Sequence, residues 1–314
     1  MRLPFSPMLL SRAPAPLEDS GWLYQVKWDG VRNLTLVESG RVRHWSRRGR
    51  DRTLLFPELD GLGAALGGSR AVLDGEIVVL RDGKPSFAGI LERDTGGGRA
   101  DPGKVRSHPA VLMIFDLLEH GHRPLYQVPI EERLRLLQEV VPPGPAWQVV
   151  DSFPGEQGPD LFQAAVEHGL EGVVAKRLGS TYQPGIRSRD WVKIKRRQRI
   201  LAAVCGYTAP AGRPGSLLLG AFRENELVYI GRVGTGIRPE DLDLLRTHLR
   251  PGPCPFPRVP SLRDRFARDP GPVVWTEPVL TVEVEFSEWT EDLRLRDPVL
   301  VGFSSRLAEA ARLQ

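Results

Sequence analysis

Short runs of apolar and β-branched residues, separated by turn residues, fill much of the first two thirds of the chain. Runs of this length and composition predict β-strands rather than helices. The predicted strands cover residues 22–26, 33–37, 41–45, 71–73, 77–80, 110–115 and 172–175. Apolar residues recur at helical spacing in three other segments, residues 57–66, 130–140 and 159–168. Because strands and helices alternate irregularly, the pattern predicts an α+β fold with antiparallel sheets.

The pattern changes near residue 199, where short strands begin to alternate with Gly/Pro turns. The predicted strands beyond this point are residues 200–207, 216–222, 227–233, 273–275 and 280–288, with one predicted helix at residues 239–249. Five strands with a helix between the third and fourth are typical of a small Greek-key barrel such as an OB-fold. We therefore predict two domains, residues 1–198 and residues 199–314, the second an OB-fold β-barrel.

Composition indicates an ordinary globular protein. The chain has 314 residues, enough for two domains, with 41% hydrophobic and 26% charged residues. The apolar stretch at its N-terminus is too short and too often interrupted by Pro for a signal peptide or a membrane span. The two cysteines, Cys205 and Cys254, form neither a disulfide framework nor a zinc motif. We expect a cytoplasmic protein with no membrane association.

Lysine is rare in this chain and concentrated in a few short strings. Only six of its 43 basic residues are lysines. Four of the six lie in the strings KWDGVR (Lys27), EGVVAK (Lys176) and WVKIK (Lys193 and Lys195). A guanidinium group cannot lose its proton in a protein, whereas a lysine amine can lose it and then attack an electrophile. We therefore predict that Lys27 is a covalent nucleophile.

The residues around Lys27 suit an attack on a phosphoryl group. Neighbouring cations or a bound metal ion favour the neutral, reactive form of an amine. In an extended segment Asp29 lies on the same side as Lys27, where it is a candidate for orienting the amine or holding the metal. Gly30 permits a tight turn, after which Arg32 can reach the same phosphates. A strand end followed by a solvated turn is the alternative interpretation of this string alone.

Three other strings supply further candidates. In SRRGRD, Arg47 or Arg50 is a candidate for binding ribose or phosphate. Glu76 in LDGEIV lies between apolar neighbours of a predicted strand, where a carboxylate needs a buried cation or a metal as its partner. Phe115 in IFDLL, at the end of another predicted strand, is a candidate for stacking on a base. Surface turns and core packing are the alternative interpretations of these strings.

The string WVKIK predicts a strand that carries two ammonium groups on one face. Lys193 and Lys195 are two residues apart, and Trp191 shares their face. Adjacent ammonium groups repel each other unless an anion lies between them, and a polyphosphate meets that need. In EGVVAK, period two places Glu171 and Lys176 on opposite faces unless the strand bends.

The most concentrated positive charge of the chain lies between residues 187 and 199. The net charge is only +4, but this stretch carries seven basic residues against the single acidic residue Asp190. The basic residues are Arg187, Arg189, Lys193, Lys195, Arg196, Arg197 and Arg199. Contact with a polyanion and a solvated charged face are both compatible with such a run.

Taken together and in order, these strings resemble the nucleotidyltransferase motifs of ATP-dependent DNA ligases. The resemblance runs over most of the chain and is greatest to the ligase domain of bacterial end-joining ligases, including stand-alone forms. It implies an adenylation domain followed by an OB-fold domain. It also implies three phosphoryl transfers: Lys27 takes AMP from ATP, AMP passes to the 5′-phosphate of a nick, and the 3′-hydroxyl displaces AMP to seal the strand.

The resemblance also assigns roles to individual residues, all of them expectations. The catalytic residues would be Lys27, Asp29, Arg32, Lys193 and Lys195. The ATP site would comprise Gln25, Lys27, Arg32, Arg47, Glu76, Phe115, Glu171, Lys176, Lys193 and Lys195, with Glu76 and Glu171 holding Mg²⁺ or Mn²⁺. DNA would contact Arg47, Arg50, Arg187, Arg189, Arg196 and Arg197. The implied partners are nicked duplex DNA and other DNA-repair proteins, and we expect a monomer.

Two departures from the family pattern change the expected rates. Gln25 stands two residues before the nucleophile, where the family often has Glu. Residues 302–310 read GFSSRLAEA, without the lysine of the basic cluster that normally orients the pyrophosphate leaving group. Arg294, Arg296 and Arg306 are the candidate substitutes. We therefore expect slow self-adenylation but competent sealing of pre-adenylated nicks.

Two alternative functions remain open at this point. One is an RNA ligase or a capping-type guanylyltransferase, which would use the same nucleophile. The other is a non-catalytic protein that binds nucleic acid through the barrel and the basic run.

Overall fold

The computed structural model of the chain describes residues 6–17, 19–94, 98–209, 215–262, 272–287, 289–290 and 292–313. The chain divides into two compact units, residues 1–195 and 196–314. This division lies just before the boundary at residue 198 that the sequence predicts. In the described part of the chain, no helix has both the length and the apolar character needed to cross a membrane.

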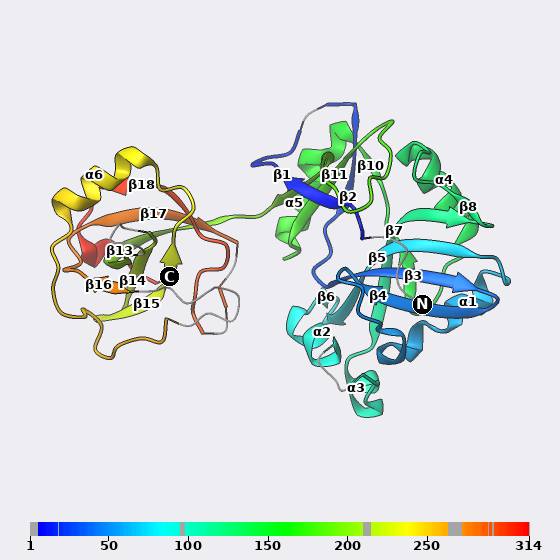
Figure 1. Ribbon diagram of the computed structural model, residues 1–314, viewed down its shortest axis with the longest axis horizontal. Helices are drawn as coiled ribbons and strands as arrows, with labels where there is room; N and C mark the ends of the chain where they lie inside the picture. Colours follow the sequence, from blue (N-terminus) through cyan, green and yellow to red (C-terminus); the bar gives the residue numbers. More distant parts are fainter. Residues whose placement is uncertain are drawn as a thin grey trace. The chain divides into compact units, whose positions relative to one another are not determined.

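The first unit is built on two β-sheets (Figure 1). The larger sheet has the strand order β4-β3-β5-β7-β8, with β6 paired to β5 and β9 paired to β7. Its strands are β3 (Val31–Glu38), β4 (Arg41–Ser46), β5 (Ala71–Arg81), β6 (Lys84–Pro85), β7 (Ala110–His120), β8 (Arg123–Pro124) and β9 (Trp147–Val149). The smaller sheet has the order β1-β12-β11-β2-β10. Its strands are β1 (Leu9–Arg12), β2 (Trp22–Val26), β10 (Phe153–Pro154), β11 (Gly172–Arg177) and β12 (Arg187–Lys195).

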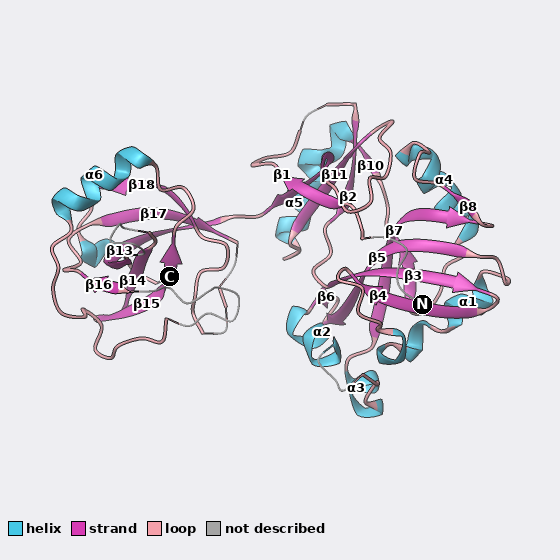
Figure 2. Cartoon of the chain, in the orientation of Figure 1, coloured by secondary structure: helices cyan, strands magenta, loops and turns pink. Residues whose placement is uncertain are grey.

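The predicted antiparallel arrangement is confirmed for most of these strands. In the described part of the unit, only β1 with β12 and β7 with β9 run parallel. Both exceptions involve a short strand that joins the edge or end of a sheet from a distant part of the chain. The unit also contains the helices α1 (Gly61–Ala65), α2 (Phe87–Asp94), α3 (Pro102–Ser107), α4 (Ile130–Val140) and α5 (Gly158–Glu167). Figure 2 shows how helices and strands are mixed in this unit.

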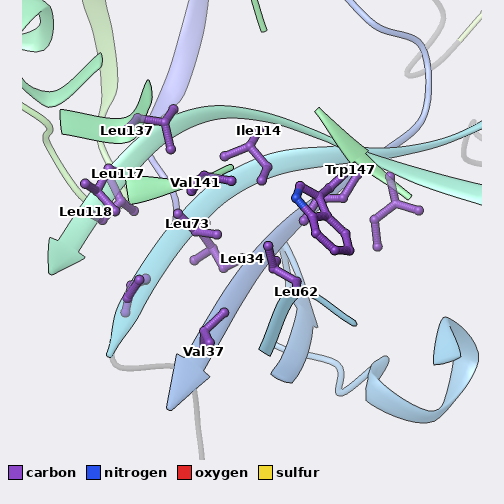
Figure 3. Packing of buried hydrophobic residues seen from close by; sticks show 14 of the residues in the cluster. Leu34, Val37, Leu62, Leu73, Ile114, Leu117, Leu118, Leu137, Val141 and Trp147 are labelled. Carbon is purple, nitrogen blue, oxygen red and sulfur yellow. The ribbon is translucent and has the colours of Figure 1, made fainter. Parts of the chain in front are cut away.

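Helices cover the outer faces of both sheets. In the larger sheet, leucine side chains such as Leu34 of β3 and Leu73 of β5 belong to one cluster with Leu62 of α1 and Leu137 of α4 (Figure 3). In the smaller sheet, Val192 and Ile194 of β12 pack in a separate cluster with residues of α5. Since side chains alternate along a strand, Trp191, Lys193 and Lys195 face the opposite side of the smaller sheet, as the sequence predicts.

The second unit is a small antiparallel β-structure with one longer helix. Its strand order is β15-β14-β13-β17-β18, with β16 paired to β13. The strands are β13 (Gln198–Thr208), β14 (Leu217–Arg223), β15 (Glu226–Val233), β16 (Val273–Trp275), β17 (Thr281–Phe286) and β18 (Val299–Ser304), and the helix is α6 (Pro239–His248). A bridge between Thr235 and Val299 links the chain just after β15 to β18, so that the two ends of the sheet meet. This arrangement agrees with the predicted barrel.

Three expectations about elements need correction. Residues 71–73 and 77–80 belong to one continuous strand, β5. Two features of the intervening residues allow this: Asp74 is paired with Arg32, and Gly75 lies so close to the Met113 carbonyl oxygen that a Cβ would be only 2.8 Å from it. The predicted helix at 57–66 is a 3-10 turn (Pro57–Leu59) followed by the short α1. Strand β18 was not predicted, and the last residue of predicted strand 280–288 lies outside the described residues.

Candidate active site

A pocket of about 430 Å³ lies in the first unit, and both of its sheets contribute side chains to the wall. Residues of β1, β2, β11 and β12 line it from the smaller sheet, and residues of β3, β5 and β7 line it from the larger one. The lining residues are Leu10, Gln25, Val26, Lys27, Trp28, Arg32, Glu76, Phe115, Val174, Lys176 and Trp191. Five of the residues predicted to bind ATP are therefore brought together with the predicted nucleophile.

Lys27 lies directly after β2 and is held at the pocket by its backbone and by its amine. Its backbone N–H donates to the carbonyl of Gly172 at 2.9 Å. Its Nζ forms an ion pair with one carboxylate oxygen of Glu171, and Nζ of Lys195 forms an ion pair with the other. One carboxylate thus holds two amines, from the ends of two different strands.

The backbone of Gly172 makes this arrangement possible. Its φ is +142°, and a Cβ at this position would lie 2.1 Å from the carbonyl oxygen of Ile194. Only glycine tolerates both the conformation and the close approach. Strands β11 and β12 pair Gly172 with Lys195, which explains why Glu171, one residue earlier, reaches the Lys195 amine.

Positive charge exceeds negative charge at this end of the pocket. Burial alone raises the pKa of Glu171, but the ammonium groups of Lys27 and Lys195 more than offset this, and the pKa lies below its usual value. Burial and the nearby cations Lys195 and Arg12 together lower the pKa of Lys193 to about 8, and Glu171 opposes this only in part. A group of cations that share one carboxylate is a suitable site for a polyphosphate.

Arg32 is fixed in the wall of the pocket by a buried carboxylate. Its Nε and Nη2 donate to the two oxygens of Asp74 at 2.6 and 2.7 Å. Its guanidinium carbon lies 4.7 Å from the ring centre of Phe115 and 5.8 Å from that of Trp191. Burial acts to lower the pKa of Arg32, but the carboxylate of Asp74 raises it by more, so the pKa lies above its usual value. Arg32 therefore stays charged beside the ring that is predicted to stack on the base.

Lys176 occupies a slot between the two aromatic residues. Its Nζ donates to the Phe115 carbonyl at 2.7 Å and lies 4.1 Å from the ring centre of Trp191. The side chain is almost completely buried, and burial lowers the pKa of the amine to about 7. Its charge is therefore easily changed near neutral pH.

Glu76 is the pocket carboxylate without a strong counter-ion. It pairs across β3 and β5 with Arg32, whose guanidinium is already bound by Asp74. Burial raises the pKa of Glu76 to about 7, although Lys27 and Arg32 act to lower it. Among the described residues no group of three or more His, Cys, Asp or Glu side chains is placed to hold a metal ion. A cation here would rest on one or two carboxylates and on ligands from a nucleotide.

The other predicted nucleotide contacts are placed as follows. Gln25 is buried in the pocket wall, and its Nε2 donates to Ser152 Oγ at 3.0 Å. Asp29 lies in the turn between β2 and β3 and is partly exposed. Asp29 is near enough to Glu76 for its charge to contribute to the raised pKa of that carboxylate.

The predicted DNA-contacting arginines of the first unit fall into two kinds. Arg47 is exposed, and its pKa is lowered by partial burial and by the nearby cations Arg32, Arg187 and Arg48, with no carboxylate among its influences. Arg187 and Arg189 begin β12 and are also exposed. Arg50 instead donates to the Asp94 carbonyl at 3.0 Å. Arg47 and Arg189 thus have side chains available for an anion, whereas Nη1 of Arg187 donates to the Leu10 carbonyl at 2.5 Å and only its other N–H groups are available.

The basic residues of the second unit also include both exposed side chains and side chains held in ion pairs. Arg196 is exposed, whereas Arg197 and Arg199 form ion pairs with Glu285, at 3.3 and 2.7 Å. Of the C-terminal arginines, Arg294 packs on the ring of Tyr229 and donates to its carbonyl.

Sequence reasoning missed the partners that hold the site residues. Asp74, Tyr182 and the neighbouring Asp116 are buried polar residues that were not singled out. Asp74 lies two residues before Glu76 in LDGEIV, and Asp116 directly follows Phe115 in IFDLL. A charged residue inside an apolar strand is the signal that could have found them.

A unit of two sheets that encloses a lysine-bearing, cation-rich pocket, followed by a small β-barrel, defines a nucleotidyltransferase. Comparison with known proteins identifies the group. Residues 7–195 match the ATP-dependent DNA ligase domain, and residues 210–305 match the ATP-dependent DNA ligase C-terminal region. The chain belongs to the ATP-dependent DNA ligases.

Several relatives are similar over nearly the whole chain. The multifunctional non-homologous end joining protein LigD of Mycobacterium bovis is 37% identical over 300 residues, which are 93% of this chain and 37% of LigD. A DNA ligase of Thermococcus onnurineus is 28% identical, over 97% of this chain and 55% of that ligase. The chain therefore spans little more than a third of the length of the LigD protein.

Solved structures give the same result. The ligase domain of LigD from M. tuberculosis is 32% identical, with a TM-score of 0.55, and the match covers 99% of this chain and 98% of that domain. A mycobacterial DNA ligase D complexed with ATP is 33% identical, with a TM-score of 0.56 over the same shares. These matches confirm the DNA ligase prediction and the order of an adenylation domain and an OB-fold-type domain. They favour DNA ligase over the RNA ligase, capping-type and non-catalytic alternatives.

Proposed function

We propose that this ATP-dependent DNA ligase forms its covalent intermediate on Lys27. The observation that carries the proposal is the placement of Lys27 at the pocket, where Glu171 holds its amine beside that of Lys195. The neutral amine attacks the α-phosphorus of ATP. The bond from Nζ to phosphorus forms, the bond from phosphorus to the bridging oxygen breaks, pyrophosphate leaves, and the amine proton passes to water.

The same atoms account for the later steps. A 5′-phosphate oxygen at the nick attacks the phosphorus of lysyl-AMP, and Lys27 leaves as an amine that takes up a proton. The 3′-hydroxyl then attacks the 5′-phosphate, loses its proton and displaces AMP. Each step moves a phosphoryl group, so the protein contributes mainly by positioning and by neutralising charge. Lys193 and Lys195 suit that role for the phosphates of ATP.

Base binding follows from the aromatic side of the pocket. We propose that Phe115 stacks on adenine, with Gln25 and Lys176 at the edge of the base. Support comes from their shared position in the pocket wall and from the single acceptor that occupies Lys176. Among the described residues, Gln25 has one observed side-chain partner, Ser152.

A divalent cation, Mg²⁺ or Mn²⁺, fits the carboxylate of Glu76. Its raised pKa, about 7, marks a carboxylate whose charge its surroundings do not compensate, and a cation would compensate it. Mg²⁺ is commonly held by one or two carboxylates together with substrate phosphates. Glu171 fits less well, because both of its oxygens already hold lysines. When bound, the cation neutralises charge that develops on the transferring phosphate.

DNA contacts are proposed for the exposed arginines. Arg47 and Arg187 lie near each other and near Arg32, so they suit the 5′-phosphate of the nick, and Arg189 and Arg196 suit the adjoining backbone. Arg50 and Arg197 are held by Asp94 and Glu285 and would have to exchange partners to take part.

The decisive test is covalent labelling with α-³²P-labelled ATP. Wild type should retain label after denaturation, Lys27→Arg should retain none, and the matched control Lys84→Arg, an exposed lysine in β6, should label normally. Label on the Lys27→Arg protein would show that another residue is the nucleophile. Label with GTP instead of ATP would contradict the assigned nucleotide.

The unusual C-terminal region leads to an expectation about rates. Arg306 is exposed, whereas Arg294 is bound to Tyr229, so Arg306 is the better substitute for the lysine that the family usually has. We propose that self-adenylation is slower than sealing of a pre-adenylated nick, and that Arg306→Gln slows only the former. Fast adenylation followed by slow sealing would contradict this.

The cellular role that we propose is DNA repair by end joining, in the cytoplasm, as a monomer that works with other repair proteins. The similarity to LigD supports it, although the chain spans only 37% of that protein. Sealing of linear duplexes with cohesive or blunt ends, compared with sealing of a single nick in the same duplex, tests the role. Activity confined to nicks would favour excision repair or back-up sealing.

A further inference from the structure

Asp74 is the centre of a buried hydrogen-bond group behind the pocket. It is completely buried in β5 and accepts three hydrogen bonds. Two come from Arg32, through Nε and Nη2. The third comes from the hydroxyl of Tyr182, which donates to Oδ2 at 2.7 Å.

Tyr182 is itself firmly placed. It lies between β11 and β12, is 1% exposed, and its hydroxyl oxygen accepts the backbone N–H of Met8 at 3.0 Å. Its ring meets Trp191 edge to face, at 5.6 Å between ring centres, and lies 6.2 Å from the ring of Tyr126. Burial raises its pKa well above the usual value, so the hydroxyl remains a proton donor throughout the working range of pH.

This geometry leaves one nitrogen of Arg32 for a ligand. Nε and Nη2 are bound to Asp74, and Nη2 also reaches the Met8 carbonyl at 3.3 Å. Among the described residues Nη1 has no observed hydrogen-bond partner, and Arg32 lines the pocket. The direction of Nη1 depends on the plane of the Asp74 carboxylate, because the two groups pair through two parallel hydrogen bonds.

We propose that Tyr182 is a positioning residue for Arg32. Its hydroxyl fixes the rotation of the Asp74 carboxylate, and the carboxylate in turn directs Nη1 of Arg32 toward the phosphate that is transferred. The inference rests on the proposed function, in which Arg32 binds the phosphate of AMP or of the nick. It adds Tyr182 to the site, a residue that lies 150 positions after Arg32, in the segment that joins β11 to β12.

A double-mutant cycle separates this role from mere structural support. The rates of adenylation, of AMP transfer and of sealing are measured for wild type, Tyr182→Phe, Arg32→Gln and the double variant. Phenylalanine keeps the ring contacts with Trp191 and removes only the hydroxyl. Tyr126→Phe is the matched control, since it removes a hydroxyl from the neighbouring ring and keeps the hydrogen bond that the Tyr182 hydroxyl donates to Asp74.

We expect Tyr182→Phe to slow by about tenfold those steps that Arg32→Gln slows most, because a hydrogen bond to a charged group is lost. In the Arg32→Gln background, Tyr182→Phe should slow the same steps by less than about twofold. The rates of Tyr126→Phe should stay within about twofold of those of the wild type. If Tyr182→Phe is unstable at the assay temperature, the same cycle is measured at a lower temperature at which the variant is folded.

Multiplicative effects of the two substitutions, or wild-type rates for Tyr182→Phe, would overturn the role of Tyr182. The proposed function is tested separately in the same assays. A wild-type protein that takes no label from ATP would refute that function, whereas a labelled wild type with multiplicative variants would refute only the inference about Tyr182.

Discussion

The buried pair of Arg133 and Asp116 offers the sharpest test of how the first unit is held together. Arg133 of α4 donates from Nε and Nη2 to both oxygens of Asp116 in β7, at 2.8 Å each, and neither side chain is exposed. Its Nη1 donates to the Val128 carbonyl at 2.6 Å and to the Ser180 carbonyl at 3.3 Å. Arg133 therefore joins the larger sheet to the segment that follows β11 of the smaller one.

Arg133→Met removes this guanidinium while filling much of its volume. It leaves a buried carboxylate without a counter-ion, and removal of one partner of a buried pair costs about 3–5 kcal/mol. Arg135→Met in the same helix is the matched control. Arg135 pairs with Glu139 on the surface, and such pairs contribute less than about 1 kcal/mol.

Urea unfolding followed by tryptophan fluorescence measures the difference. Five of the seven tryptophans report on the first unit: Trp22, Trp28, Trp45, Trp147 and Trp191. With a slope of about 2 kcal/mol per molar urea, Arg133→Met should lower the midpoint by about 1.5–2.5 M.

Similar midpoints for Arg133→Met and Arg135→Met would refute the reasoning. The double variant Asp116→Leu/Arg133→Met gives a second check. Because it leaves no lone charge in the interior, it should recover most of the lost stability. A double variant as unstable as the single one would show that the two carbonyl contacts of Arg133, rather than its charge, matter most.

Three further outcomes are expected. Burial lowers the pKa of Lys176 to about 7 from 10.5, so between these pH values the unfolded chain binds a proton that the folded chain lacks. The free energy of unfolding therefore rises with pH by up to about 1.4 kcal/mol per unit. The urea midpoint of the wild type should increase from pH 7 to pH 9, and this increase should be smaller in Lys176→Met. Glu76→Gln should increase the Mg²⁺ concentration for half-maximal adenylation at least about tenfold, and an unchanged requirement would exclude Glu76 as a ligand. Gly172→Ala should reduce labelling by more than about tenfold in a protein with a native circular dichroism spectrum, whereas Gly179→Ala, with positive φ but open space around it, should label normally.

The sequence predicts the chemistry of the site better than its connections. The period of two in WVKIK correctly places Lys193 and Lys195 on one face of a strand, because Val192 and Ile194 must be buried against α5. Glu171 is different, because it precedes β11 and its two lysine partners come from other strands. The pairing of β11 with β12 on one side and with β2 on the other brings it between them, and strand pairing is not written in local sequence.

The hydrogen-bond partners behind the pocket could not be predicted from the sequence for the same reason. The hydroxyl of Tyr182 and the carboxylate of Asp74 lie 108 positions apart, and Arg133 and Asp116 come from a helix and a strand. The pattern shows that a charge inside an apolar strand needs a partner, but it does not identify the partner. Long-range packing decides that, and a single sequence contains no direct record of it.

The distribution of arginine and lysine in the first unit follows the number of acceptors that each site offers. The guanidinium of Arg133 is completely buried and faces four acceptor oxygens, two from Asp116 and two from backbone carbonyls. Among the residues that the structure describes, one acceptor is observed in the slot of Lys176, the Phe115 carbonyl, beside the face of Trp191. An arginine there would bring five N–H donors into a site with a single acceptor and leave several unsatisfied, at about 1–3 kcal/mol for each. A chain that otherwise prefers arginine therefore uses lysine in this slot for a physical reason that is independent of the reactivity that selects lysine at position 27.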